Sequence, residues 1–341
     1  MKKGLLYLYK KIELLLFIAI GIIFLSKYIP IGKVAYLPLL SFGFPICLFI
    51  LGLYLFVQIF NIKQWKVKQY LILIFFLFQL PHFFQLSKAE KSITSFSIMT
   101  YNVKGFNHKA ERSVNYKKIE TFLKEENPDI LCLQEVQWKG TSVIHKNATK
   151  TNSTYTITSR FPIVNQGEFK IEGQKYIRNI FADLKIDKDT IRVYNIHLES
   201  NKFQSENYEL INNIDDYLLD EKQGLKTGVT STLRKLNYAY KAKAKQLHRL
   251  EQHISNCKYP VFICGDFNDI AHSNSYKRLS NDLKDSFISK GIGFGGTLNT
   301  LKLPLRIDYI LYNNEAFKCL NHTVFREKMS DHHPIRADFT K

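Results

Sequence analysis

Acidic residues are almost absent from the first quarter of the chain. Glu13 is the only one before Glu90, although the 341 residues contain 30 Asp and Glu in all. The same segment is dominated by Leu, Ile, Phe and Tyr, a composition that excludes an ordinary soluble domain there. The later residues have the mixed composition of a soluble domain. We therefore expect a membrane region, a linker and a soluble domain at residues 1–86, 87–94 and 95–341.

The chain also lacks paired cysteines. Its five cysteines show no Cys-x-x-Cys motif and no regular spacing, so nothing indicates a disulfide framework or a zinc site. Cys132 and Cys264 lie in apolar segments, and we expect them to be small core residues. Internal repeats and low-complexity tracts are missing as well, which argues against a repeat architecture.

Three apolar runs occupy the acid-poor segment, at about residues 12–31, 34–60 and 69–84. A transmembrane helix needs about 20 predominantly apolar residues. The second run exceeds this length, whereas Lys27 interrupts the first run and the third is short. We expect about three transmembrane helices, kinked or tilted. A secretory signal peptide is the alternative for the first run, but no small-residue cleavage site follows it and two more apolar runs do.

The lysines indicate how such helices would be oriented. Four lysines precede the first run, and Lys63, Lys66 and Lys68 separate the second run from the third. Cytoplasmic loops are enriched in Lys and Arg, so the amino terminus and this second loop are expected to face the cytoplasm. With three spans in the inner or plasma membrane, the soluble domain then lies on the non-cytoplasmic side. With two spans the soluble domain would lie in the cytoplasm.

The net charge of +18 arises from 48 basic and 30 acidic residues. Residues 1–91 contain 11 of the basic and two of the acidic residues, so this segment and the rest of the chain carry +9 each. A basic domain suits a polyanionic substrate or an anionic membrane surface. A generally basic proteome would explain the charge equally well.

The soluble part alternates between predicted strands and helices. Phe96–Tyr101 alternates as a half-buried strand does, and Ile119–Glu126 is expected to be a short helix that ends before Pro128. A longer helical region with one apolar face is expected at about 230–254. The other predicted strands are 130–133, 180–186, 190–196, 261–264 and 307–311.

Polar residues stand where several of these strands end. Asn102 follows the first strand, Glu135 comes just after the second, His197 closes the segment 190–196, and Asp266 follows 261–264. Each residue alone has an ordinary explanation, such as a cap or a turn. Their joint occurrence, completed by Ser330-Asp331-His332 near the carboxyl terminus, indicates that these side chains converge on one site.

These motifs resemble those of the endonuclease/exonuclease/phosphatase superfamily, which includes pancreatic-type deoxyribonucleases, abasic-site endonucleases, neutral sphingomyelinases and inositol polyphosphate 5-phosphatases. The resemblance covers about residues 94–341. It implies an α/β fold, the DNase I-like four-layer α/β/β/α sandwich with two mixed β-sheets. The motifs are Thr100-Tyr101-Asn102-Val103, Leu133-Gln134-Glu135, Asn195-Ile196-His197-Leu198, Gly265-Asp266-Phe267-Asn268, Arg306-Ile307-Asp308-Tyr309-Ile310 and Ser330-Asp331-His332.

The resemblance also implies a metal site. Glu135 would be the principal ligand of a divalent cation, assisted by Asn102 and Asp331. An oxygen-only ligand set suits Mg²⁺, with Mn²⁺ as the alternative. Lys104 stands where abasic-site endonucleases have a further metal-binding aspartate, which puts a second metal in doubt.

Catalytic roles follow from the same resemblance. Asp308 would fix the tautomer of His332, which would act as a base toward water or as a phosphate-binding cation. Asp266 and Asn268 would orient the attacking water and a phosphate oxygen. His197 would protonate the leaving oxygen, and a histidine at this position is shared with pancreatic-type nucleases and several lipid-directed branches.

Two further positions complete the comparison. Arg178 stands where pancreatic-type nucleases place a phosphate-contacting arginine, with a surface salt bridge as the alternative. His333 has no role in the resemblance, and we expect it to be exposed to solvent.

The predicted reaction is hydrolysis of a phosphoester by a metal-assisted water. The basic soluble domain, His197 and Arg178 favour nucleic acid as the substrate, whereas the membrane segment favours a phospholipid or inositol phosphate at the bilayer surface. A third hypothesis is a membrane-anchored binding protein that has lost its activity. It is disfavoured because every matched catalytic position is occupied.

Overall fold

The computed structural model divides into two compact units. One comprises Met1–Pro81, Asn201–Ala244 and His272–Lys277, and the other His82–Ser200, Lys245–Ala271 and Arg278–Lys341. The domain boundaries expected from composition stay a prediction. The structure describes residues 2–30, 40–60, 62–90, 93–106, 112–136, 144–150, 154–169, 179–200, 222–299 and 303–341.

The first unit contains three helices that correspond to the three apolar runs. Glu13 joins them, because its carboxylate accepts hydrogen bonds from Tyr54 Oη at 2.7 Å and from Lys68 Nζ at 2.9 Å. In the described part of the chain, one helix, Ser41–Ile59, is long and apolar enough to cross a membrane by length and composition, and Glu13–Ser26 and Val67–His82 are shorter. The helices are α1 (Lys2–Ser26), α3 (Phe44–Ile59) and α4 (Val67–Gln79), with the 3-10 turns η1 (Ser41–Gly43) and η2 (Ile62–Gln64).

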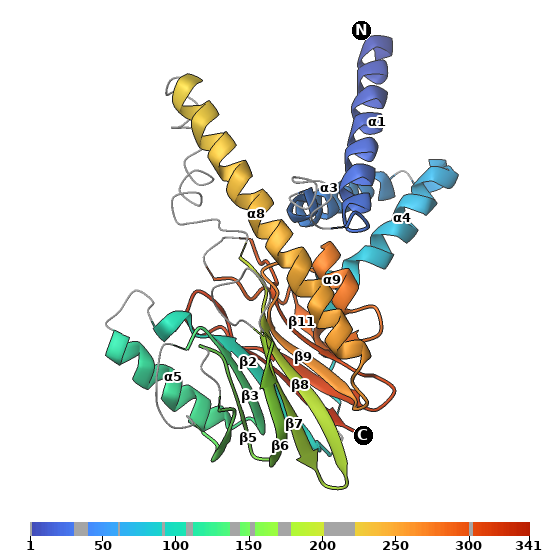
Figure 1. Ribbon diagram of the computed structural model, residues 1–341. Helices are drawn as coiled ribbons and strands as arrows, with labels where there is room; N and C mark the ends of the chain where they lie inside the picture. Colours follow the sequence, from blue (N-terminus) through green and yellow to red (C-terminus); the bar gives the residue numbers. More distant parts are fainter. Residues whose placement is uncertain are drawn as a thin grey trace. The chain divides into compact units, whose positions relative to one another are not determined.

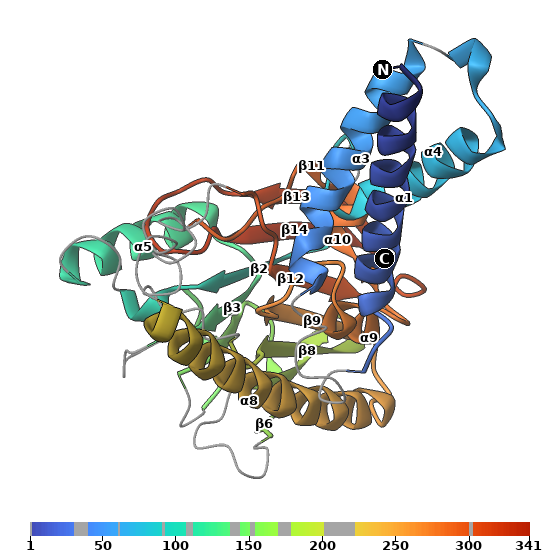
Figure 2. The same ribbon diagram turned by 90° about the horizontal axis from the view of Figure 1, so that it is seen from above.

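Two six-stranded mixed sheets form the body of the second unit. Figures 1 and 2 show this part of the molecule from two sides. One sheet has the order β13 (Lys318–Val324), β14 (Ile335–Thr340), β2 (Phe96–Asn102), β3 (Ile130–Gln134), β5 (Thr156–Ser159) and β4 (Asn147–Ala148). The other has the order β10 (Lys284–Asp285), β12 (Asp308–Tyr312), β9 (Val261–Asp266), β8 (Asp189–His197), β7 (Asn179–Ile186) and β6 (Ile163–Glu168).

Shorter elements of the second unit are η4 (Lys104–Phe106), α10 (Ser286–Lys290) and the two-stranded pair β1 (Gln85–Leu86) and β11 (Ile292–Gly293). The residues of η3 (Leu80–His82) and α9 (Asn274–Leu279) are divided between the two units.

Apolar residues at alternate strand positions pack the sheets face to face. Phe96 and Ile98 on β2 belong to one buried cluster with Val193 on β8 and with Phe262 and Cys264 on β9. Because successive side chains of a strand point to opposite faces, these residues mark the inner faces of both sheets. The main core therefore lies between the sheets, and the expectation that Cys132 and Cys264 are core residues is confirmed.

Helices cover the two outer faces. α5 (Arg112–Glu126) packs Ile119 and Leu123 against the outer residues of β2 and β3. Figure 1 shows this helix beside the two strands. On the other sheet, His253 near the end of α8 (Lys222–Ser255) lies 2.8 Å from Tyr194 Oη and stacks on Phe169. The predicted four-layer arrangement is thus present in the second unit.

Three sequence-based expectations need correction. β2 is buried at every position rather than half-buried, because α5 covers its outer face. α5 begins at Arg112 instead of Ile119, since its first two turns are mostly polar and show no apolar stripe. α8 likewise extends beyond the predicted 230–254 at its amino-terminal end.

Candidate active site

The candidate site lies between the two sheets, at the end of the apolar core. The inner-face positions of β2, β3, β8 and β9 end in polar residues, Asn102, Gln134, His197 and Asp266. β2 runs parallel to β3 with Asn102 opposite Gln134, and β8 runs parallel to β9 with His197 opposite Asp266. The carboxyl ends of these strands meet at one edge, so their polar side chains converge as the sequence predicts.

Asn102 connects carboxylates from both sheets. Its Nδ2 donates to Glu135 Oε1 and to Asp266 Oδ2, each at 3.1 Å. His197 Nε2 lies 3.5 Å from the same Asp266 oxygen and 3.7 Å from the same Glu135 oxygen. The side chain of Glu135 is 38% exposed, whereas that of Asp266 is 1% exposed. A substrate would therefore reach this cluster from the side of Glu135.

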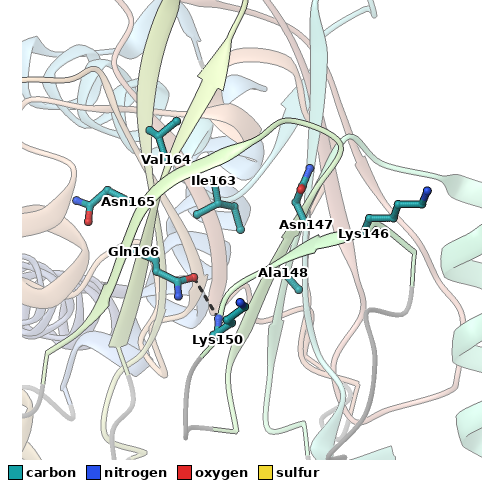
Figure 3. Close-up of a pocket in the computed structure, with 8 residues that line it drawn as sticks. All are labelled: Lys146, Asn147, Ala148, Lys150, Ile163, Val164, Asn165 and Gln166. Carbon is teal, nitrogen blue, oxygen red and sulfur yellow. Dashed lines mark hydrogen bonds between the residues drawn. The ribbon is translucent and has the colours of Figure 1, made fainter.

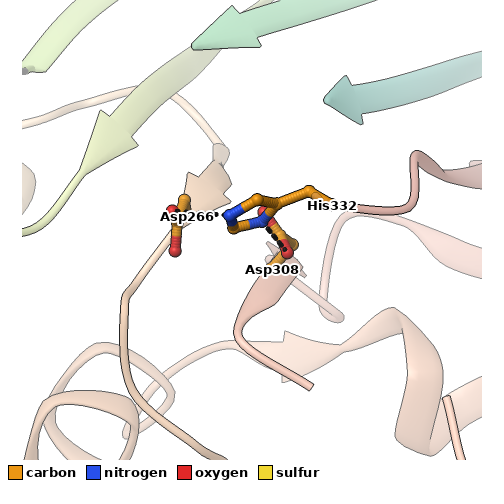
Figure 4. A group of neighbouring side chains, drawn as sticks. All are labelled: Asp266, Asp308 and His332. Atoms are coloured by element: carbon orange, nitrogen blue, oxygen red, sulfur yellow. Dashed lines mark hydrogen bonds and ion pairs between the residues drawn. The ribbon is translucent and has the colours of Figure 1, made fainter. Parts of the chain in front are cut away.

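His332 and Asp308 form the acid and imidazole pair (Figure 4). His332 Nδ1 lies 2.9 Å from Asp308 Oδ2, and its Nε2 lies 3.7 Å from Asp266 Oδ2. Asp308 begins β12 directly opposite Asp266. The Thr297 hydroxyl accepts hydrogen bonds from the backbone N–H groups of Ile307 and Asp308 at 3.0 and 3.1 Å. These contacts hold the imidazole between two carboxylates.

Two site residues have left-handed backbone conformations, with φ of 57° at Glu135 and 48° at Asn268. Such values are uncommon outside glycine and persist only where the surroundings hold them. Glu135 directly follows an inner-face residue, so regular strand geometry would turn its side chain outward. The positive φ instead directs the Glu135 side chain toward Asn102. Asn268 is fixed by its backbone N–H, which donates to Asp266 Oδ1 at 2.7 Å, and by its Nδ2, which donates to Leu198 O at 3.0 Å.

The Ser-Asp-His segment is docked on the end of β2. Ser330 Oγ donates to Asn102 O at 2.8 Å, and Asp331 Oδ2 lies 2.6 Å from Lys104 Nζ. Asp331, the third metal ligand expected from the sequence, therefore has an ammonium partner in this structure. Arg178 lies outside the described residues, so its predicted phosphate contact has no structural description.

The sequence matches the model of the Endonuclease/Exonuclease/phosphatase family over residues 99–332. The chain belongs to this family. The matched segment contains the site described above, from Asn102 to His332, and members of the endonuclease/exonuclease/phosphatase family hydrolyse phosphoester bonds. No curated protein matches the sequence.

Solved structures resemble the chain at low sequence identity. Truncated TDP2 of Caenorhabditis elegans has a TM-score of 0.48 and 18% identity, over 72% of this chain and 98% of that one. A mannosyl-6-phosphatase of Bacteroides thetaiotaomicron has a TM-score of 0.48 and 15% identity, over 72% and 100%. A Neisseria 3′ phosphatase bound to a product DNA hairpin has a TM-score of 0.48 and 17% identity, over 72% and 100%. Membership of the endonuclease/exonuclease/phosphatase family rests on the sequence match.

Members of this family generally use divalent metals, and the side chains here fit one. Ligand atoms of Asp266, Asp308 and His332 lie within 4.8 Å of one another. Asp308 Oδ1 is buried and has no hydrogen-bond partner among the described residues. Glu135 adds a carboxylate oxygen beside this group, and hard cations prefer such ligands. Asn102 presents its Nδ2 to the cluster, and its Oδ1 accepts a hydrogen bond from the backbone N–H of Lys104 at 3.0 Å. Asp266 and Asp308 therefore add two carboxylates to the ligand set expected from the sequence.

Burial and the charges of neighbouring groups shift the pKa values of the buried site residues. Burial raises the pKa of Asp266 to about 7, with His332 opposing the shift and Asp308 adding to it. Burial alone would lower the pKa of His332, but Asp308 and Asp266 outweigh it and raise the value to about 10. Burial also disfavours the charged form of Asp331, yet His332 and Lys104 outweigh it and lower its pKa. At neutral pH the site therefore holds an imidazolium beside an Asp266 carboxyl that exchanges its proton readily.

Some site residues were not predicted. Tyr155 Oη lies 2.9 Å from His197 Nδ1, and Thr297 supports the backbone before Asp308. Neither residue lies in a recognisable motif, so only the tertiary structure identifies them. The expected exposure of His333 was wrong, because its side chain is buried and its backbone N–H donates to Thr297 O at 2.7 Å.

A separate hollow of about 370 Å³ lies where the edge strands β4 and β6 approach each other (Figure 3). The backbone N–H of Lys150 donates to Gln166 Oε1 at 3.1 Å across it. None of the predicted catalytic or metal-binding residues lines this hollow, which is formed by Lys146, Asn147, Ala148, Lys150, Ile163, Val164, Asn165 and Gln166.

Proposed function

We propose that the protein is a divalent-metal-dependent phosphodiesterase that cleaves nucleic acid. The observation that carries this proposal is the His332 imidazole, held 2.9 Å from Asp308 and 3.7 Å from Asp266 beside the cluster of Glu135 and Asn102. Mg²⁺ or Mn²⁺ bound by Glu135 and Asn102, with Asp331 as a further candidate ligand, would offset the negative charge that develops on the phosphoryl oxygens.

The chain's own residues orient the phosphate and the water. Asp308 holds Nδ1 of His332, so Nε2 is the nitrogen that faces Asp266 and the site. Because two carboxylates keep His332 protonated, it acts as a cation toward a phosphoryl oxygen. Asp266, with a pKa of about 7, is suited to take the proton of the attacking water.

Leaving-group protonation falls to His197 in this proposal. Its Nε2 faces Asp266 and Glu135 across the same cluster. Asn268, fixed beside Asp266, and Arg178 are the proposed phosphate-binding residues.

Charge favours nucleic acid over other phosphodiesters. Residues 92–341 carry half of the net charge of +18, which suits a polyanion whose binding weakens steeply with salt. The competing substrate is a phospholipid or inositol phosphate, favoured by the apolar helix Ser41–Ile59, which would hold the site near a bilayer.

The direct test incubates the full-length protein with DNA, RNA, sphingomyelin and inositol phosphates, with Mg²⁺ and then with excess chelator. We expect cleavage of a nucleic acid that the chelator abolishes and Mg²⁺ or Mn²⁺ restores. Cleavage of sphingomyelin alone would show that the substrate is a phospholipid and not nucleic acid. Turnover that persists with the chelator would contradict metal dependence.

Variants test the assigned residues. Glu135→Gln, Asp266→Asn and His332→Gln should each lower kcat at least about a hundredfold. Asp282→Asn serves as the matched control, because Asp282 is an exposed carboxylate outside the site. Thermal unfolding of each variant separates lost chemistry from lost structure. A folded His332→Gln enzyme with the full rate would overturn the assignment.

We also propose that residues 1–86 anchor the protein in the inner or plasma membrane, with the catalytic domain on the non-cytoplasmic side. Large apolar side chains on α1, α3 and α4 are exposed, among them Leu15, Phe49, Phe56 and Phe78 at 65%, 67%, 63% and 76%. Protease added to intact cells should digest the catalytic domain. Protection until lysis would reverse the sidedness, and release by alkaline carbonate would contradict the anchor.

A further inference from the structure

Tyr155 contacts the nitrogen of His197 that points away from the reacting centre. Its hydroxyl lies 2.9 Å from Nδ1, and the two rings meet edge to face with centroids 5.7 Å apart. Both residues are 5% exposed. The contact is therefore shielded from water, which would otherwise compete for the same nitrogen.

The other nitrogen of His197 faces two carboxylates. Nε2 lies 3.5 Å from Asp266 Oδ2 and 3.7 Å from Glu135 Oε1, both of which are acceptors. An N–H at Nε2 would therefore point toward the catalytic cluster, where the substrate would bind. A hydroxyl at Nδ1 can accept a hydrogen bond from an N–H or donate one to a lone pair, so it serves the ring in either protonation state.

We propose that Tyr155 is a positioning residue that holds Nδ1 of His197 and thereby directs Nε2 at the leaving oxygen of the substrate. The inference rests on the proposed phosphodiesterase function. As the water oxygen bonds to phosphorus and the bond to the leaving oxygen breaks, doubly protonated His197 passes its Nε2 proton to that oxygen and keeps the electron pair of the N–H bond on Nε2. The Nδ1 proton remains hydrogen-bonded to the Tyr155 hydroxyl. Without the hydroxyl the ring loses the Tyr155 contact at Nδ1 and is held less firmly.

The same fold contains a matched pair away from the site. Tyr194 Oη lies 2.8 Å from His253 Nδ1, with both residues on the outer side of the second sheet. Tyr194 is on the same strand as His197, but its side chain points to α8. Removing this hydroxyl changes a tyrosine–histidine contact of equal chemistry that does not touch the catalytic cluster.

The test compares Tyr155→Phe with Tyr194→Phe in the full-length protein. We expect Tyr155→Phe to lower kcat about ten- to a hundredfold with KM changed less than about twofold, since a small misplacement of a catalytic group has effects of this size. Tyr194→Phe should keep both values. Similar melting temperatures for the two variants would exclude a general loss of structure.

A spectroscopic readout reports on the ring itself. With ¹⁵N-labelled histidine and the His197 signals assigned through His197→Gln, Tyr155→Phe should shift the Nδ1 resonance and alter the tautomer pattern. An unchanged His197 pattern, or an unchanged kcat in an active enzyme, would overturn the proposal. If the wild type cleaves no phosphodiester, the proposed function fails, and the ¹⁵N spectra still decide whether Tyr155 sets the state of His197.

Discussion

Gln134 on β3 and Asn195 on β8 join the two sheets by a 2.7 Å hydrogen bond from Nε2 to Oδ1. Gln134 also donates to Thr100 Oγ1 at 2.8 Å, and Asn195 donates to two backbone carbonyls at 2.9 Å. These side chains are fully buried; Gln134 directly precedes Glu135, and Asn195 lies two residues before His197. They form a polar tier between the apolar core and the site, and they set the spacing of the sheets where the catalytic residues face each other.

Replacing Asn195 by Ala should lower the free energy of unfolding by about 2–3 kcal/mol, because it leaves buried donors and acceptors without partners. Urea denaturation of the full-length protein measures the change. Asn281→Ala is the control, since its amide donates to the neighbouring Asp282 at an exposed position. An Asn195→Ala protein as stable as Asn281→Ala would show that the tier contributes nothing.

Gly265→Ala should be far more harmful than Gly293→Ala, although both glycines have positive φ values of 135° and 71°. A Cβ at Gly265 would lie 2.0 Å from Ile196 O on the paired strand β8, whereas one at Gly293 meets nothing within 4 Å. We expect a loss of at least about 3 kcal/mol, or no folded protein, for Gly265→Ala. Gly293→Ala should cost about 1 kcal/mol. Equal melting temperatures for the two variants would contradict this account of the β8–β9 contact.

The location of the site was predictable from strand ends. Apolar segments such as 130–133 and 261–264 end in polar residues, and parallel pairing places such ends at one edge. Side chains alternate between the two faces of a strand, and this alternation also predicts that Asn102, His197 and Asp266 lie on the inner face. Glu135 does not follow this alternation. Its side chain reaches the site because its backbone is left-handed, and no sequence pattern predicts that conformation.

Contacts made through loops were not predictable. Tyr155 precedes a short strand and Thr297 lies in a glycine-rich segment, and each reaches the site only through tertiary packing. The burial of His333 follows from backbone pairing around Thr297, which sequence periodicity does not describe. The half-burial expected for β2 failed for a related reason, because burial of the outer face depends on a helix distant from the strand pattern.

Breaking the ion pair of Arg306 and Asp285 should destabilise the fold strongly. Arg306 Nη1 lies 2.6 Å from Asp285 Oδ2, with side chains 4% and 2% exposed. Arg306→Ala leaves a buried carboxylate without its cation, and we expect a loss of about 3–5 kcal/mol. Replacing both residues by apolar ones of similar volume should recover much of this loss. Urea denaturation of the single and double variants measures both effects.

The exposed pair of Lys318 and Glu90 provides the contrast. Lys318 is 59% exposed, and water screens its interaction with the carboxylate. Lys318→Ala should therefore leave the unfolding midpoint unchanged within error. A comparable loss from Lys318→Ala and Arg306→Ala would mean that burial does not decide the strength of these pairs.

His322 should make stability depend on pH in the acidic range. Burial lowers the pKa of its imidazole to about 4, with Asp285 opposing the shift and Arg306 adding to it, and Ser286 Oγ contacts Nδ1 at 2.9 Å. The unfolded chain takes up this proton near the ordinary value of about 6.5. The stabilisation from keeping the ring neutral is thus complete above about pH 6.5 and is lost as the pH falls toward 4. For this residue the loss between about pH 7 and pH 5 is about 2 kcal/mol.

The variant His322→Gln removes the titrating group and should flatten this part of the profile. The relevant quantity is the difference between wild type and variant in the pH dependence of the free energy of unfolding, because other groups titrate in both proteins. His248→Gln is the control, since His248 is exposed on α8 and its removal should leave the profile as in the wild type. Identical slopes for wild type and His322→Gln between pH 7 and pH 5 would show that the buried ring is not the group that takes up the proton.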